Sequence, residues 1–173
     1  MNETSTHEFF SLSGRTLPLT CTTYNRPANA CIFPAHWHQQ VELLAVTQGS
    51  MRIVCGDTVC EISKGGVLLV NPYESHLGYA GDDGVEYHCL IAEVSLCGET
   101  SQSNPLPAFQ NHLTDPAVFS LITATEKEYR ERAVGFELFI RAHLLLIFSH
   151  LTRHYQAAPA AHENDARISN IIR

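Results

Sequence analysis

The feature that most constrains the fold is a change of pattern, about 95 residues into the chain, from short β-type runs to helical periodicity. Before that point, runs rich in β-branched and aromatic residues alternate with clusters of Gly, Pro, Asn and Asp. The predicted strands are Leu17–Tyr24, Cys31–Phe33, Val41–Thr47, Met51–Cys55, Thr58–Ile62, Val67–Val70, His76–Ala80 and Val85–Ser95. Many short strands with regular turns are typical of a β-sandwich or barrel, so we expect a mainly β domain over residues 17–98.

Turn residues divide the predicted strands. Gly56-Asp57 stands between two β-rich runs and indicates a two-residue hairpin. Asn71-Pro72 and Gly81-Asp82-Asp83-Gly84 are also typical turn sequences. We therefore expect the chain to leave the sheet at each of these places.

Two helices are predicted after residue 111. Asp115-Pro116 combines a preferred N-cap residue with a proline suited to the first helical turn, so one helix is predicted from there to about Glu131. A second is predicted from about Val134 to His154-Tyr155, because apolar residues recur there at helical spacing. The members of this stripe are Phe136, Phe139, Ile140, His143, Leu144, Ile147, Phe148 and Leu151. Residues 112–156 are therefore expected to form a helical pair.

Two leucines of the second predicted helix lie outside the apolar stripe. Leu138 and Leu145, together with Arg141 and Thr152, are predicted to form a homodimer interface, because one barrel face cannot cover all the apolar surface of this helix. The alternative is a helix enclosed between the barrel and the first helix.

The ends of the chain have a different character. Residues 1–16 are largely polar, with an apolar pair at Phe9-Phe10, and are expected to form a mobile arm. Residues 157–173 begin with an Ala-Pro sequence and continue with an apolar-periodic segment. We expect a linker there, followed by the start of a further helical domain that continues beyond Arg173.

The overall composition limits the function and the location of the chain. The formal net charge of −7 repels a phosphate backbone, so this chain is not expected to hold nucleic acid by itself. The six cysteines form no Cys-x-x-Cys pair, which favours buried free thiols in a reducing compartment. The N-terminus has no export signal, and the longest apolar stretch, Leu144–Phe148, is too short to span a bilayer. We expect a cytoplasmic protein that does not bind membranes.

The strongest functional signal is a histidine-rich motif. His36 and His38 are two residues apart and are expected to point to the same side of a strand, and Glu42 keeps the same parity. With His76 they are predicted to converge inside the barrel. One interpretation is a site for a divalent transition metal (Zn, Ni, Fe, Mn or Cu). A second is a metal-free pocket in which the same groups hydrogen-bond a polar ligand, and a third is that the histidines only pack against each other as satisfied polar groups.

Further pocket residues are predicted from aromatic and polar positions on the later strands. Tyr79, Tyr87 and His88 are expected to contact a ligand, because pockets combine aromatic walls with a few polar groups. Trp37 has the opposite parity to its histidine neighbours and is expected to pack on the outside of the barrel, under the arm or the helices.

The spacing of these residues is similar to that of a known family. His36-x-His38-x3-Glu42-x6-Gly49 matches the first cupin motif, and Gly66-x5-Pro72-x3-His76 resembles the second, with Glu74 in place of the usual glycine. These departures, and the order of the parts, resemble the N-terminal effector-binding and dimerisation domain of AraC/XylS-type transcription regulators. The resemblance implies a cupin barrel (a double-stranded β-helix of jelly-roll type) followed by a pair of α-helices.

The resemblance also implies a function. Tyr87-His88 resembles a position at which sugar-responsive members contact their ligand, so the expected partner is a small polar, sugar-like effector. DNA would be bound only through a C-terminal domain that is not part of this sequence. We therefore expect a sensor and not an enzyme. The alternative is a metal-dependent cupin enzyme, of dioxygenase or sugar isomerase type, that uses His36, His38, Glu42 and His76.

Overall fold

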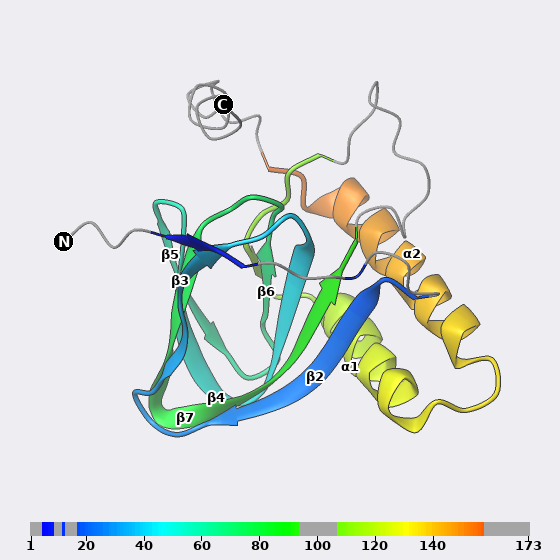
Figure 1. Ribbon diagram of the computed structural model, residues 1–173, viewed down its shortest axis with the longest axis horizontal. Coiled ribbons are helices and arrows are strands. Elements are labelled where there is room, and N and C mark those ends of the chain that lie inside the picture. Colours follow the sequence, from blue (N-terminus) through cyan, green and yellow to red (C-terminus); the bar gives the residue numbers. More distant parts are fainter. Residues whose placement is uncertain (1–4, 9–11, 13–16, 94–106, 158–173) are drawn as a thin grey trace.

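The computed structural model describes residues 5–8, 12, 17–93 and 107–157. As predicted, the fold is mainly β with two C-terminal helices: a mixed sheet wraps into a barrel, and the helices cover one side of it (Figure 1). The strands are β1 (Thr6–His7), β2 (Leu19–Arg26), β3 (Cys31–Trp37), β4 (Val41–Cys55), β5 (Thr58–Ser63), β6 (Val67–Val70), β7 (His76–Ala92) and β8 (His112–Leu113). The helices are α1 (Pro116–Glu131) and α2 (Phe136–His154).

Two long strands form the backbone of the barrel. β4 and β7 are antiparallel and pair along almost their whole length, from Val41↔Ala92 to Cys55↔His76. The sequence predicts each as two shorter strands, and the turn predicted at residues 81–84 is wrong, because β7 continues through it. β7 also pairs with β2 along its second half and with β3 along its first half.

Glycines allow the two long strands to bend together. The register between β4 and β7 shifts on both sides of Gln48 and Gly49. Gly49 has φ +69°, and a Cβ atom built on it would lie 2.0 Å from the carbonyl oxygen of Gly84. Any side chain at Gly49 would therefore push the strands apart at this bend.

Alternation along the strands separates two apolar clusters. One face of β4 and β7, which includes Leu44 and Ile91, packs inside the barrel. The opposite face, which includes Leu43 and Leu90, packs against Val118 of α1 and other helical residues. Glu42 has the same parity as Leu44 and therefore points into the barrel.

The helix boundaries follow local sequence signals. Asp115 is the N-cap of α1, as predicted, and Pro116 is its first residue. α2 begins at Phe136, two residues after the predicted start. Its buried residues are Ile140, Leu144, Ile147, Phe148 and Leu151. Among the described residues, no helix has the length and hydrophobicity required to cross a bilayer.

The four residues predicted as a dimer interface all lie on α2, outside its buried stripe. Leu138 and Leu145 are 73% and 48% exposed. Arg141 and Thr152 are half-buried. The exposure of the two leucines leaves an apolar surface that α1 and the barrel do not cover.

The described part of the N-terminal segment lies against the barrel. β1 pairs in parallel with the end of β3, and the backbone N–H of Glu8 donates to the carbonyl of Trp37 over 2.9 Å. The His7 ring stacks on the indole of Trp37, with 4.2 Å between ring centroids. Leu12 is buried in the inner apolar cluster. Trp37 therefore packs under this segment, whereas Phe9-Phe10 lies outside the described residues.

Candidate functional site

Four polar residues converge inside the apolar barrel. His36 lies near the end of β3, His38 directly follows that strand, Glu42 lies at the start of β4, and His76 begins β7. All four are buried, and one ligand atom from each lies within 4.8 Å of all the others. The structure thus brings together the four residues that the sequence predicts to converge.

Each imidazole is oriented by a backbone carbonyl. Nδ1 of His36 lies 2.8 Å from the oxygen of Pro34, Nδ1 of His38 lies 3.1 Å from that of Gln40, and Nδ1 of His76 lies 3.0 Å from that of Glu74. A carbonyl can only accept, so Nδ1 must be the protonated nitrogen of each ring. Neutral rings therefore direct an Nε2 lone pair into the site, which is the tautomer that a metal-ligating histidine requires.

The carboxylate of Glu42 lies among these rings. Its Oε2 is 3.0 Å from Nε2 of His38 and 3.1 Å from Nε2 of His76. Its Oε1 accepts from the thiol of Cys89 over 3.2 Å. Within the described part of the chain, Nε2 of His76 has no partner with hydrogen-bond geometry. With all three rings neutral, the site therefore holds more lone pairs than protons, and an added cation or hydroxyl donor would satisfy it.

Burial and charge act against each other in this cluster. Burial alone would raise the pKa of Glu42, but the imidazoles of His38 and His76 hold that pKa well below its usual range. Burial alone would lower the pKa of His76, and the contact with Glu42 reverses this and raises it. Burial, followed by the nearby His76, lowers the pKa of His36. The pair formed by Glu42 and His76 thus favours charge separation, whereas His36 favours the neutral form.

The donor set fits a divalent metal. Three imidazoles and one carboxylate are borderline ligands suited to Zn, Ni, Fe or Mn. Two donors held about 2.1 Å from one ion at right angles, as in octahedral coordination, are about 3.0 Å apart. The separations of Glu42 Oε2 from His38 and His76 have this size. His36, His38, Glu42 and His76 could therefore hold a metal without a large rearrangement.

Two residues near the cluster are not among the predicted site residues. Cys89 donates to Glu42, and its inward direction follows from its parity with Tyr87, so the strand alternation contains this signal. Glu8 follows β1 and places its Oε2 2.9 Å from Nε2 of His36. Its polar N-terminal context contains no signal for such a contact, because the pairing of β1 with β3 is non-local.

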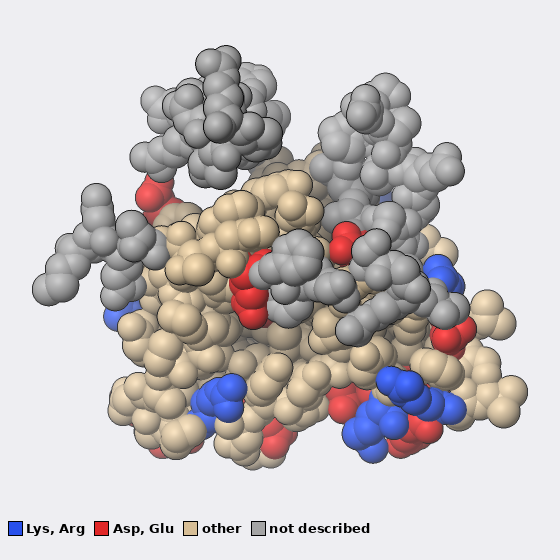
Figure 2. All heavy atoms as spheres, viewed as in Figure 1, with Lys and Arg blue, Asp and Glu red and all other residues tan. Residues whose placement is uncertain are grey.

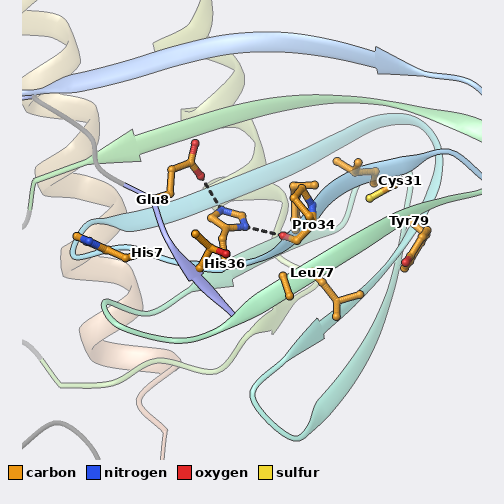
Figure 3. A pocket seen from close by; sticks show the side chains of 11 residues that line it. His7, Glu8, Cys31, Pro34, His36, Leu77 and Tyr79 are labelled. Carbon is orange, nitrogen blue, oxygen red and sulfur yellow. Dashed lines mark hydrogen bonds and ion pairs between the residues drawn. The ribbon is translucent and has the colours of Figure 1, made fainter. Parts of the chain in front are cut away.

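A cavity lies beside His36. It has a volume of about 670 Å³, and Figure 3 shows the His36 ring between the Glu8 carboxylate and the Pro34 carbonyl. Its lining residues come from β1, β3, β7 and the segments next to them: Thr6, His7, Glu8, Cys31, Ile32, Phe33, Pro34, Ala35, His36, Leu77 and Tyr79. Tyr79 is 44% exposed at this cavity. His36 is thus shared between the cavity and the buried cluster.

The structure separates two neighbouring residues that the sequence predicts as ligand contacts. Tyr87 points into the barrel and stacks on Tyr24, with 5.5 Å between ring centroids. His88 points to the other face of β7, where its Nδ1 lies 2.9 Å from the hydroxyl of Thr23. That hydroxyl donates to Glu126 of α1 over 3.2 Å. The structure therefore does not bring His88 to the cluster, because consecutive strand residues face opposite sides.

Solved structures with similar backbones include two bacterial enzymes. A variant of oxalate decarboxylase from Bacillus subtilis is 18% identical, with 44% of this chain and 22% of that chain covered and a TM-score of 0.41. A formate complex of oxalate decarboxylase from Lactobacillus farciminis is 21% identical, with 43% and 23% covered and a TM-score of 0.40. The chain thus spans less than a quarter of the length of these enzymes.

A further similar structure is the cupin domain of Cnp3 from Schizosaccharomyces pombe. It is 19% identical, with 45% of this chain and 58% of that domain covered and a TM-score of 0.42. No individually curated protein is significantly similar in sequence. The sequence model of one family, the AraC-like ligand binding domain, matches residues 21–148, which include most of the barrel and both helices up to the fourth turn of α2. The chain therefore belongs to the family of AraC-like ligand binding domains.

Proposed function

We propose that this chain is the effector-sensing and dimerisation domain of a bacterial AraC-type transcription regulator and binds a small polar metabolite. The observation that carries the proposal is the convergence of His36, His38, Glu42 and His76 in an otherwise apolar barrel. Buried polar groups are normally satisfied within the protein, yet Nε2 of His76 has no hydrogen-bond partner among the described residues. A ligand that supplies the missing donor explains why these groups are buried together.

The chemistry of the cluster favours a ligand rich in hydroxyl groups. A hydroxyl can donate to the lone pair of His76 or to Glu42 and can accept from a protonated ring at the same time. Sugars and related metabolites present several such groups at short spacing. Tyr87 from inside the barrel and Tyr79 from the adjoining cavity are the aromatic residues proposed to contact the ligand.

A divalent metal is the second proposed occupant of the cluster. His36, His38, Glu42 and His76 would hold it, and a bound metal would act as a Lewis acid that anchors an oxygen of the effector. The chain's own contribution is orientation, because the carbonyls of Pro34, Gln40 and Glu74 fix the three rings.

A polar contact joins the barrel to α1. His88, Thr23 and Glu126 form a chain of close polar contacts on the helix-facing side of β7, while the adjacent Tyr87 and Cys89 face the cluster. We propose that His88 takes part in signalling through this contact and not by touching the ligand. A ligand acts on the helices only if its affinity differs between two arrangements of β7 and α1.

The output of the domain is proposed to pass through a homodimer in the cytoplasm. Leu138, Arg141, Leu145 and Thr152 on α2 are the proposed interface, supported by the exposure of the two leucines. On the face shown in Figure 2, Lys and Arg side chains lie beside Asp and Glu and do not form one broad basic patch. With a net charge of −7, this agrees with DNA binding by a separate domain of the regulator.

Calorimetry with a panel of monosaccharides and sugar acids tests the proposal. Wild-type protein, with and without Zn²⁺, is compared with His76→Ala and with His112→Ala, whose residue is exposed on β8. We expect at least one compound to bind wild type and His112→Ala, and His76→Ala to bind it at least tenfold more weakly. Equal affinity in both variants would remove the cluster from the effector site. Metal-dependent turnover of a bound compound would instead favour the enzyme alternative.

A further inference from the structure

We propose that Glu8 is a fifth protein donor to a metal in the cluster, so that metal binding fastens the N-terminal segment to the barrel. The inference rests on the proposed metal occupancy of His36, His38, Glu42 and His76. It adds a ligand from outside the barrel strands that carry the motif.

The separation between Glu8 and His36 suits a hydrogen bond and equally suits two neighbouring ligands of one metal ion. Oε2 of Glu8 lies 2.9 Å from Nε2 of His36, close to the 3.0 and 3.1 Å that separate Glu42 Oε2 from Nε2 of His38 and His76. Donors at right angles on one ion, as in octahedral coordination, are about 3.0 Å apart. Nδ1 of His36 is directed to the Pro34 carbonyl, so Nε2 is the atom left for the metal, and Glu8 lies beside it.

The backbone positions Glu8 but leaves its carboxylate room to move. The N–H of Glu8 donates to the carbonyl of Trp37, which fixes its Cα beside the end of β3. The Glu8 side chain is 49% exposed, whereas that of His36 is 10% exposed. A carboxylate on the open side of the cluster can therefore shift toward an ion without disturbing the packed core.

Charge balance favours the same arrangement. A divalent ion with three neutral imidazoles and Glu42 keeps one positive charge inside an apolar barrel. A buried net charge is costly, and a second carboxylate removes it. Within the described part of the chain, Glu8 is the carboxylate that lies beside His36 on the cavity side.

The chain contains its own reporter for this step. Trp37 is its single tryptophan, and His7 stacks on it at 4.2 Å between ring centroids. Since His7 immediately precedes Glu8, fastening of Glu8 by a metal should hold the imidazole over the indole. Accessibility of Trp37 to a neutral quencher therefore measures whether residues 5–8 are docked.

The experiment titrates Zn²⁺ into the metal-free chain and follows binding by calorimetry and Trp37 quenching by acrylamide. The variants are Glu8→Gln and Glu8→Ala, with Glu61→Gln on the exposed face of β5 as the matched control. We expect both Glu8 variants to bind Zn²⁺ about tenfold more weakly than wild type and the control. We also expect Zn²⁺ to reduce quenching of Trp37 in wild type but not in the Glu8 variants.

The outcomes that contradict the inference are separable. Unchanged or tighter Zn²⁺ binding by the Glu8 variants would show that Glu8 is not a ligand, or that it competes with the metal for His36. Wild-type protein that binds no Zn²⁺ would overturn the metal site and the role of Glu8 together. Neither result decides the sensing proposal, which depends on the separate calorimetry with effectors.

Discussion

Asp115, the N-cap residue of α1, places its Oδ2 2.6 Å from Nε2 of His150 in the last turns of α2. The same carboxylate accepts from the backbone N–H groups of Ala117 and Val118 and from the hydroxyl of Tyr155. One side chain thus caps the first helix and joins it to the end of the second. The two helices are held as a pair by this polar contact as well as by their apolar faces.

We predict that Asp115→Ala lowers the free energy of unfolding by about 2 kcal/mol, because it removes a helix cap together with two contacts between the helices. Asp115→Asn is the control, because an amide oxygen still accepts from the helix N-terminus. The free energy of unfolding should fall clearly less in Asp115→Asn than in Asp115→Ala. Urea denaturation at neutral pH measures both, and an unchanged midpoint in Asp115→Ala would contradict the role of the cap.

The same carboxylate predicts a loss of stability in acid. Burial alone would raise the pKa of Asp115, but hydrogen bonds from His150, Tyr155 and two backbone N–H groups lower that pKa below its ordinary value of 3.8. A depressed pKa in the folded state contributes stability above about pH 4, and this contribution disappears as the pH falls through the folded value. Acid unfolding should therefore begin at a higher pH in Asp115→Asn than in wild type, and coincident curves would contradict this.

His88 also predicts that stability depends on pH, but here the folded state disfavours the charged form of the side chain. Burial lowers its pKa below 6.5, and the nearby Glu126 only partly offsets this effect. The folded state therefore disfavours the charged ring, so stability falls as the pH drops below about 6.5. We predict that His88→Asn loses less stability than wild type between pH 7 and pH 5. Urea denaturation at both pH values measures the loss of stability in each protein. The contributions of the other histidines cancel when the two losses are subtracted. Equal losses in wild type and His88→Asn would refute the prediction.

The exposed leucines of α2 predict the oligomeric state. The double variant Leu138→Glu, Leu145→Glu should shift the protein toward monomer with little change in melting temperature, because neither side chain is part of the core. Val59→Glu is the control, since Val59 is 52% exposed on β5, away from the helices. Sedimentation velocity at several concentrations decides the matter. A wild type that stays monomeric throughout would exclude the proposed interface.

The bend in β4 predicts a steric limit. Gly49→Ala should destabilise the barrel by more than about 1 kcal/mol, because φ is positive and the new Cβ would collide with the carbonyl of Gly84. Gly65→Ala is a matched control, since its φ is +86° but nothing lies within 4 Å of the added atom. Thermal melting of both variants measures their losses of stability, and the difference between these losses reports the effect of the collision. Equal losses of stability would argue against a collision.

Local chemistry explains which elements could be predicted from the sequence. The Asp115-Pro116 signal locates the start of α1 because the cap depends on adjacent residues only. The breaks predicted within β4 and β7 are wrong for the opposite reason. Gly81–Gly84 has the composition of a turn, but these residues lie within β7, at the shift in register between Gly49↔Val85 and Met51↔Ala80, where Gly84 closely approaches Gly49.

In the candidate site, too, the sequence predicts the residues that local patterns specify and misses a contact that depends on tertiary pairing. The spacing of residues in one stretch of the chain predicts His36, His38 and Glu42 as site residues, and a second motif predicts His76. Strand alternation could also have separated Tyr87 from His88, since adjacent residues on a strand cannot face the same pocket. The contact of Glu8 could not be foreseen, because it depends on a two-residue parallel pairing between segments distant in sequence.

The position of β7 also determines the order in which the barrel can form. β2, β3 and β4 all pair with this one strand, and Leu19 at the start of β2 pairs with Ala92 at the end of β7. During synthesis on the ribosome, the first three of these strands lack their main partner until β7 has left the exit tunnel. Non-local pairing of this kind slows folding, because the entropy of closing a long loop is lost before the contacts are gained. Until then the nascent chain carries unpaired strand edges, and this is the stage at which chaperones would protect it from aggregation.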